Sequence, residues 1–194
     1  MSFPAAIWSV GHSTRSLDEF LALLDHYAIE AIADVRRHPG SRRLPHFGSE
    51  ALAAALPAQG IEYRWIPELG GRRRVARDSV NTGWRNSSFQ GYADHMASAE
   101  FAAGLDQLLA LAASRRTAMM CAELLWWRCH RSLISDLLKF NRCEVHHIQD
   151  ASHLSQHPYT APARDIDGHL SYAAAGGRLL ARPRQTTPQL GLDL

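Results

Sequence analysis

The segment from residue 117 to residue 140 constrains the fold of this 194-residue chain more than any other part of it. Its apolar start, Thr117–Cys121, has the length and composition of a buried strand. A loop with two tryptophans follows, and residues 132–140 then repeat apolar positions with a helical period. A buried strand that leads through a loop into a helix is the building unit of α/β sheets, so we expect that class of fold.

The same alternation of strand and helix recurs along the chain. Ser16 and Glu19 have the spacing of a capping box at the start of the first expected helix. We predict an α/β fold with an open, mostly parallel five-stranded sheet, helices on both faces and right-handed crossovers. The expected strands are 7–10, 31–35, 62–66, 117–121 and 144–148. The expected helices are 17–27, 49–59, 100–114 and 132–140. Residues 72–91 have no clear period and are expected to run over the surface, and a helical turn is expected at 91–96.

The regular pattern ends near residue 150. Residues 1–150 are therefore predicted to be one α/β domain that carries the functional site. Residues 151–194 are predicted to be a partly irregular C-terminal tail, because Pro, Gly, Ser and Thr interrupt every periodic run there. No apolar stretch is long enough for a membrane span and the N-terminus lacks the features of a signal peptide, so we expect a cytoplasmic protein without membrane contacts.

Nearly all the positive charge is carried by arginine, since Lys139 is the only lysine. A formal net charge of +2 is too small to indicate nucleic-acid binding by itself. A GC-rich genome explains an excess of arginine without any function. The planar guanidinium groups nevertheless suit phosphate or carboxylate ligands.

Each expected strand ends in polar, reactive or glycine-rich sequence, whereas the strand starts are plainer. Because the carboxyl ends of parallel strands meet at one edge of a sheet, we expect these residues to line one cleft. Residues 11–14 lead into a helix whose amides could hold an anion, although a simple capped turn has the same pattern. Asp34 followed by Arg36 and Arg37 indicates either an acid beside an anion clamp or a structural ion pair. Arg72–Arg77 is either a solvated face or a phosphate contact.

The candidate chemistry centres on two thiols. Cys129 lies beside His130 at a helix start, where the thiol pKa should be lowered, while Cys121 has the position of a strand-end nucleophile. A buried, inert thiol is the alternative for either, and Cys143 is expected to be structural. The candidate catalytic residues are Cys121, Glu123, Cys129, His130, His12 and Asp34, and the candidate substrate-binding residues are Gly11, Ser13, Thr14, Arg36, Arg37, Tyr92 and Arg131.

Metal binding is a separate possibility for the same residues. Cys121, Cys129, His130 and His12 have suitable donor atoms, but their spacing matches no zinc ribbon or finger. We therefore expect no metal or other cofactor and keep zinc as the alternative. Trp126 and Trp127 would either stack on a ring of the ligand or cover the core.

The chain resembles the family called domain of unknown function 488. The resemblance implies a cytoplasmic α/β domain with its site at the strand ends, and it implies no particular reaction. The motifs that carry it occur in order within residues 6–150: Val10–Thr14, Asp34–Arg37 with Pro39–Ser41, Glu68–Gly71, Tyr92–Met96, Cys121–Glu123 and Cys129–Arg131.

A weaker similarity exists to rhodanese and cysteine phosphatase domains. Six residues separate Cys121 from Arg128, however, where the phosphatase signature has five. Glu123 would also repel an anion in such a loop, so the similarity is only an analogy.

Three functions remain open. The first is an enzyme that acts on a small anionic or nucleotide-like substrate, with Cys121 or Cys129 as nucleophile, Glu123 or His12 as general acid or base, and arginines as anion clamps. The second is a nucleic-acid-associated repair or replication protein. Its tail, residues 189–194, is similar to the Gln-Leu-x-Leu-Phe peptide that binds the sliding clamp, with Leu194 in place of the aromatic residue. The third is a structural role for the Cys-His-Arg motif.

Overall fold

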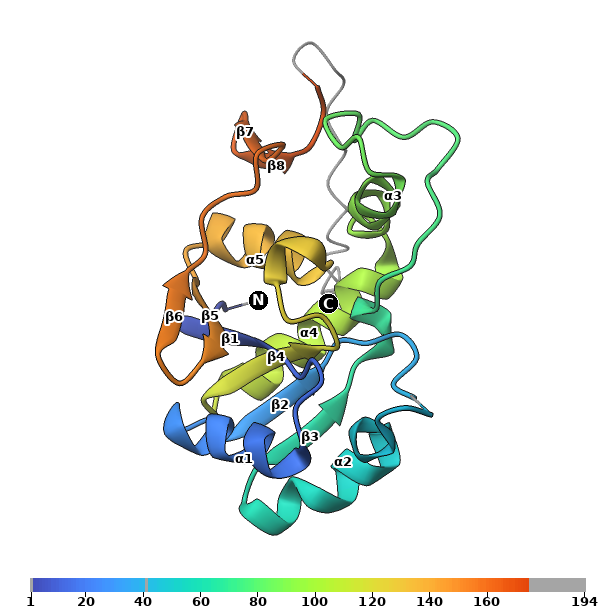
Figure 1. Ribbon diagram of the computed structural model, residues 1–194. Helices are drawn as coiled ribbons and strands as arrows, with labels where there is room; N and C mark the ends of the chain where they lie inside the picture. The colour runs from blue at the N-terminus through green and yellow to red at the C-terminus, as the bar shows by residue number, and fades with distance from the viewer. Residues whose placement is uncertain (1, 41, 175–194) are drawn as a thin grey trace, which may run out of the picture.

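The computed structural model describes residues 2–40 and 42–174. Its main sheet has six strands in the order β3-β2-β4-β1-β5-β6, of which only β6 is antiparallel (Figure 1). The predicted open, mostly parallel α/β sheet is confirmed, with one strand more than the five predicted. The strands are β1 Ala6–Gly11, β2 Ala31–Asp34, β3 Glu62–Trp65, β4 Thr117–Cys121, β5 Glu144–Asp150 and β6 His153–Gln156.

The additional strand, β6, forms a hairpin with β5 at one edge of the sheet. All four of its residues are exposed, so it has none of the apolar alternation by which a half-buried strand is recognised. The strand therefore left no periodic signal in the sequence.

Helices cover both faces of the sheet, as predicted (Figure 1). One buried cluster joins α1 and α2 to side chains such as Ile32 and Met120, and the other joins α3, α4 and α5 to Ala33 and Met119. Neighbouring strand residues thus serve opposite faces, which requires strands that are apolar throughout. The helices are α1 Leu17–His26, α2 Ser49–Ala55, α3 Ser87–His95, α4 Ala99–Ala112 and α5 Arg131–Phe140.

Local signals account for most helix boundaries. The predicted capping box is present, because the Ser16 hydroxyl accepts from the Glu19 amide and the Glu19 carboxylate accepts from the Ser16 amide. The helix expected over 49–59 ends at Ala55, and Pro57–Gln59 forms a separate 3-10 turn since Pro57 has no amide hydrogen. The turn expected at 91–96 is the end of the longer helix α3, which Asn86 caps.

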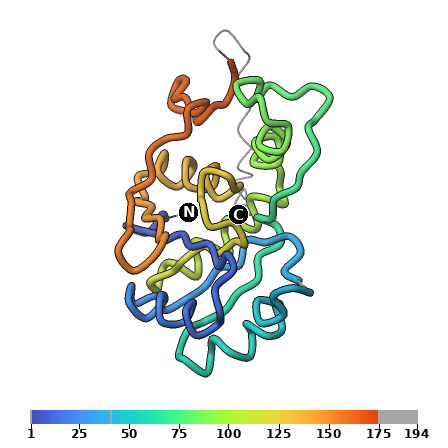
Figure 2. The backbone as a smooth tube through the Cα atoms, viewed as in Figure 1, coloured from blue at the N-terminus to red at the C-terminus, as the bar shows by residue number. Residues whose placement is uncertain are grey.

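Two segments lie outside the regular strand and helix core. Residues 72–86 contain no helix or strand, and Figure 2 shows them as a loop that runs along the outside of the molecule to α3. After β6, the short strands β7 (Arg164–Ile166) and β8 (His169–Ser171) pair as a hairpin, and Tyr172 is buried against the core. Of the predicted C-terminal tail the structure describes residues 151–174, and the clamp-like segment 189–194 lies outside the described residues. None of the described helices is long and apolar enough to cross a lipid bilayer.

Candidate functional site

The three central strands bring their polar ends to one edge of the sheet. In the pairing register, Gly11 at the end of β1 lies opposite Cys121 at the end of β4. Asp34 at the end of β2 lies opposite Met120, one residue before that cysteine. Residues that are more than 80 positions apart in the sequence are therefore neighbours at this edge.

Two thiols and an imidazole form a compact cluster there. The side-chain donor atoms of Cys121, Cys129 and His130 all lie within 4.8 Å of one another, and both cysteines are buried. His130 Nε2 is 2.8 Å from the main-chain oxygen of Val35 and must donate its hydrogen, because a carbonyl only accepts. His130 Nδ1 then carries a lone pair, and it lies 3.5 Å from the Cys129 sulfur. We call these three residues the thiol–imidazole cluster.

Arg131 holds the cluster and the loop before it in place. Its side chain is only 1% exposed. Nε donates to the Cys129 sulfur at 3.4 Å, one terminal nitrogen donates to Ser9 Oγ at 3.1 Å, and the other donates to the main-chain oxygen of Glu123. One guanidinium thus links the helix start, strand β1 and the loop that separates the two cysteines.

The two thiols have opposite proton affinities. Burial alone would raise the pKa of Cys129, but the hydrogen bond from Cys121 and the positive charge of Arg131 outweigh it and lower that pKa to about 6. The same hydrogen bond, together with burial, raises the pKa of Cys121 well above its usual value. Near neutral pH the arrangement favours a thiolate on Cys129 that accepts the S–H of Cys121.

A buried ion pair adjoins the cluster. Both carboxylate oxygens of Asp34 are used by Arg36, at 2.8 Å from Nε and 2.5 Å from Nη2, and the Tyr63 hydroxyl donates to the same carboxylate at 2.7 Å. Another nitrogen of Arg36 lies 3.2 Å from His12 Nε2 and donates to it. Burial and the charge of Arg36 lower the pKa of His12 to about 4, so this imidazole is neutral at pH 7. Of the two interpretations of Asp34 with Arg36, the structure contains the ion pair.

An open groove lined with basic side chains also adjoins the cluster. It is formed by the loop after β2, the start of the 72–86 loop, and α3. We call it the arginine groove, and its lining residues are Arg37, His38, Arg72, Arg73, Arg74, Gly91, Asp94 and His95.

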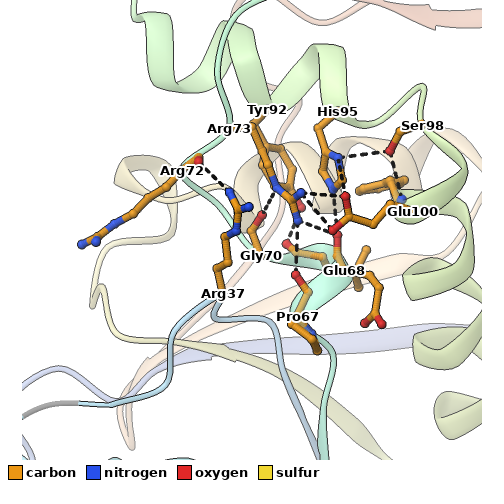
Figure 3. Close-up of polar contacts among 12 residues, drawn as sticks. Arg37, Pro67, Glu68, Gly70, Arg72, Arg73, Tyr92, His95, Ser98 and Glu100 are labelled. Carbon is orange, nitrogen blue, oxygen red and sulfur yellow. Dashed lines mark hydrogen bonds and ion pairs between the residues drawn. The ribbon is translucent and has the colours of Figure 1, made fainter.

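One arginine of the groove is fixed by the protein itself. Figure 3 shows Arg73 directed at Glu100, whose carboxylate it contacts at 2.8 and 2.9 Å, and at the main-chain oxygens of Pro67, Glu68 and Gly70. Arg37 instead donates to the main-chain oxygen of Arg72 at 3.1 Å, and Arg72 extends away from this network (Figure 3). Within the described part of the chain, no carboxylate contacts the guanidinium of Arg37, Arg72 or Arg74 at ion-pair distance.

Two consecutive glycines join the groove to the cluster. A Cβ on Gly71 would lie 2.8 Å from His130 Nδ1, and one on Gly70 would lie 2.6 Å from Arg37 Cα. The ring of Tyr92 packs against that of His130 with centroids 5.0 Å apart, while its hydroxyl donates to Leu69. The groove and the thiol–imidazole cluster therefore share a wall.

Residues 16–138 match the family described as domain of unknown function DUF488. The chain belongs to this family. The matched region extends from the cap of α1 into α5 and includes the arginine groove and the whole thiol–imidazole cluster. No curated protein and no solved structure matches the chain.

The remaining candidate residues of the DUF488 chain do not present their side chains to the thiol–imidazole cluster. Gly11 and Ser13 act through the main chain: Gly11 allows the close approach of the Glu123 carbonyl, and the Ser13 amide donates to Ala122. Thr14 is exposed. Glu123 is also exposed, and the contact it makes with Arg131 is through its carbonyl oxygen.

A buried chain of polar groups behind the cluster was not predicted. The Asp136 carboxylate lies 3.1 Å from His157 Nε2, and His157 Nδ1 lies 2.9 Å from His147 Nε2. Trp126, in the loop between the two cysteines, stacks on His147 at a centroid distance of 4.3 Å. Through this stacking contact the buried polar groups support the loop between the two cysteines. His157 directly follows β6, and the sequence of β6 has no periodic pattern that predicts a strand. The partners of His157 could therefore not be inferred from the sequence.

We expect this polar chain to make stability depend on pH. Burial, with the nearby charges of His157 and Arg131, lowers the pKa of His147 from 6.5 to about 2. The folded state therefore keeps His147 neutral while the unfolded state takes up a proton below pH 6.5, so its contribution is present at neutral pH and lost as the pH falls. In urea unfolding, the stability difference between the wild type and His147→Gln should shrink by as much as about 2 kcal/mol from about pH 7 to about pH 5. An unchanged difference would contradict a buried neutral His147.

Proposed function

We propose that this DUF488 protein is an enzyme that binds a small anionic or nucleotide-like substrate in the arginine groove and acts on it at the thiol–imidazole cluster. The observation that carries the proposal is the shared wall: Gly71 is both the neighbour of Arg72 and the surface against which His130 packs. A ligand held by the groove would thus lie beside the most reactive side chains of the molecule.

The electrostatics of the groove support an anionic ligand. Arg37, Arg72 and Arg74 supply guanidinium groups without ion-pair partners among the described residues, whereas Asp94 is occupied by contacts with Ala76, Ser79 and Asn81. Guanidinium groups match carboxylate and phosphate oxygens in pairs. Arg73, whose charge Glu100 balances, would give the groove a rigid base.

The cluster supports chemistry rather than simple binding. A thiolate, a second thiol and a neutral imidazole within 4.8 Å of one another can supply a nucleophile, an acid and a base. Arg131 and the main-chain oxygen of Val35 hold them without any ligand. Such preorganisation is expected of an active site.

Binding of inorganic phosphate and of a nucleoside monophosphate, measured by calorimetry, would test the substrate class. Replacing both Arg37 and Arg74 by Ala removes two charge-assisted contacts, and we expect affinity to fall at least about tenfold. Arg115→Ala is the matched control, because this exposed arginine lies at the opposite, amino end of the strands and pairs with Glu62. Equal affinity in the double variant and the wild type would contradict the proposal.

The same calorimetric measurement distinguishes the proposed enzyme from a nucleic-acid-binding protein. A single-stranded oligonucleotide that binds far more tightly than the monophosphate, with an affinity that falls steeply with salt, would favour a nucleic-acid-binding protein. The exposed side chain of Trp127 could then stack on a base.

A further inference from the structure

We propose that Cys121, Cys129 and His130 bind one zinc ion, or a chemically similar divalent metal, and leave a fourth coordination position for water or substrate. The inference deepens the proposed function, because it rests on the same cluster as the reactive centre. Its test is independent of any activity.

The orientation of His130 favours a ligand at this position. Its Nε2 hydrogen is committed to the Val35 carbonyl, so the lone pair of Nδ1 is directed to the side of the sulfurs. Imidazole ligands of metals typically donate their other N–H to a carbonyl or carboxylate, which fixes the tautomer and the ring. The Val35 carbonyl has this role here.

The separation of the donor atoms fits a tetrahedral metal. With Zn–S near 2.3 Å and Zn–N near 2.0–2.1 Å, a tetrahedral angle gives an S···N edge of about 3.5 Å and an S···S edge of about 3.8 Å. The Cys129 sulfur and His130 Nδ1 are 3.5 Å apart, and all three donor atoms lie within 4.8 Å of one another. The cluster would need only small side-chain movements to close around an ion.

The surroundings leave room for the imidazole nitrogen and hold the sulfur. Any side chain at residue 71 would begin 2.8 Å from His130 Nδ1, and glycine removes this obstruction. Arg131 donates an N–H to the Cys129 sulfur, a contact that stabilises a thiolate ligand from outside the coordination shell. Neither feature depends on a bound ion, so the site is formed in advance.

The donor set defines the class of metal. Two thiolates and an imidazole suit zinc and similar borderline-soft ions better than magnesium or calcium, which prefer oxygen. Within the described residues, no fourth histidine, cysteine or carboxylate joins the group. Three protein ligands with an open fourth position are typical of catalytic zinc, whereas structural zinc has four. The separation of eight positions between Cys121 and Cys129 explains why no finger or ribbon pattern is visible.

Cobalt substitution would test the inference. The purified full-length chain, stripped with a chelator under reducing conditions, should bind one Co²⁺ per chain. We expect the intense visible bands of tetrahedral cobalt and a thiolate charge-transfer band, both abolished when Zn²⁺ is added. Cys129→Ser and His130→Asn should weaken cobalt binding by more than the roughly 10- to 100-fold that loss of an outer-shell partner costs. Cys143→Ala, which removes the thiol of the residue before β5, is the control and should leave the spectrum unchanged.

The cobalt spectrum of the wild type shows whether the cluster binds a metal, even if a variant of one of the three ligand residues fails to fold. A folded wild-type chain that gives no tetrahedral cobalt spectrum would overturn the inference and leave the cluster as a thiol pair with a hydrogen-bonded imidazole. The double variant of Arg37 and Arg74 separates this result from the proposed function. It should lose phosphate binding and keep the cobalt spectrum, since neither arginine belongs to the cluster.

Discussion

Asp34→Asn is expected to destabilise the protein by about 3–5 kcal/mol, the range typical of removing one partner of a buried ion pair. Asp34 is completely buried, and its two oxygens accept hydrogen bonds from Arg36 and Tyr63. The asparagine amide would place an N–H group opposite donors and leave the Arg36 charge buried without a counter-ion. Urea unfolding of the variant and the wild type at neutral pH measures the loss.

Glu62→Gln is the matched control for this prediction. Glu62 pairs with Arg64 at 2.8 Å and with Arg115 at 2.8 Å, but both arginines are more than 40% exposed. Exposed pairs contribute about 1 kcal/mol or less each, because water screens them. If Asp34→Asn and Glu62→Gln lower the free energy of unfolding equally, the Asp34–Arg36 pair is not the desolvated contact that the structure describes.

The same pair illustrates how far the sequence alone can lead. The position of Asp34 was predictable, because a buried apolar run ends there and the parallel arrangement brings strand ends together. The alternatives of ion pair and anion clamp cannot be separated from the sequence, since the choice depends on Tyr63, which lies on β3, and on His12, which follows β1. Periodicity locates a residue along its own element, whereas its partners depend on the packing of distant elements.

The partners of the thiol–imidazole cluster are also only partly predictable from the sequence. Cys129, His130 and Arg131 are adjacent, and their joint role at a helix start was visible in the sequence. The contact of Gly71 with His130 joins residues 59 positions apart, so the arginine groove could not be connected to the cluster. In the sequence Arg72–Arg77 is only a charge run with two open explanations, and nothing links it to Arg37. Only the fold makes them neighbours of the reactive side chains.

Gly11→Ala is expected to produce the second large effect, a loss of about 3 kcal/mol, at the upper end of the usual cost of overpacking. An added Cβ would lie 2.0 Å from the main-chain oxygen of Glu123 and 2.8 Å from Leu124 Cα. These are main-chain atoms, and the Glu123 carbonyl is also held by Arg131, so the loop cannot simply rotate a side chain away. Chemical unfolding should show the loss directly.

Gly40→Ala is the matched control, because a Cβ at that position would meet nothing within 4 Å. That variant should be neutral or slightly stabilised, since alanine restricts the unfolded chain. The loop displaced by Gly11→Ala leads to Cys129, whose sulfur depends on Arg131 for its position. The Gly11 variant should therefore also weaken cobalt binding while Gly40→Ala leaves it intact. Normal stability and cobalt binding in Gly11→Ala would mean that the loop between the two cysteines is not packed against β1.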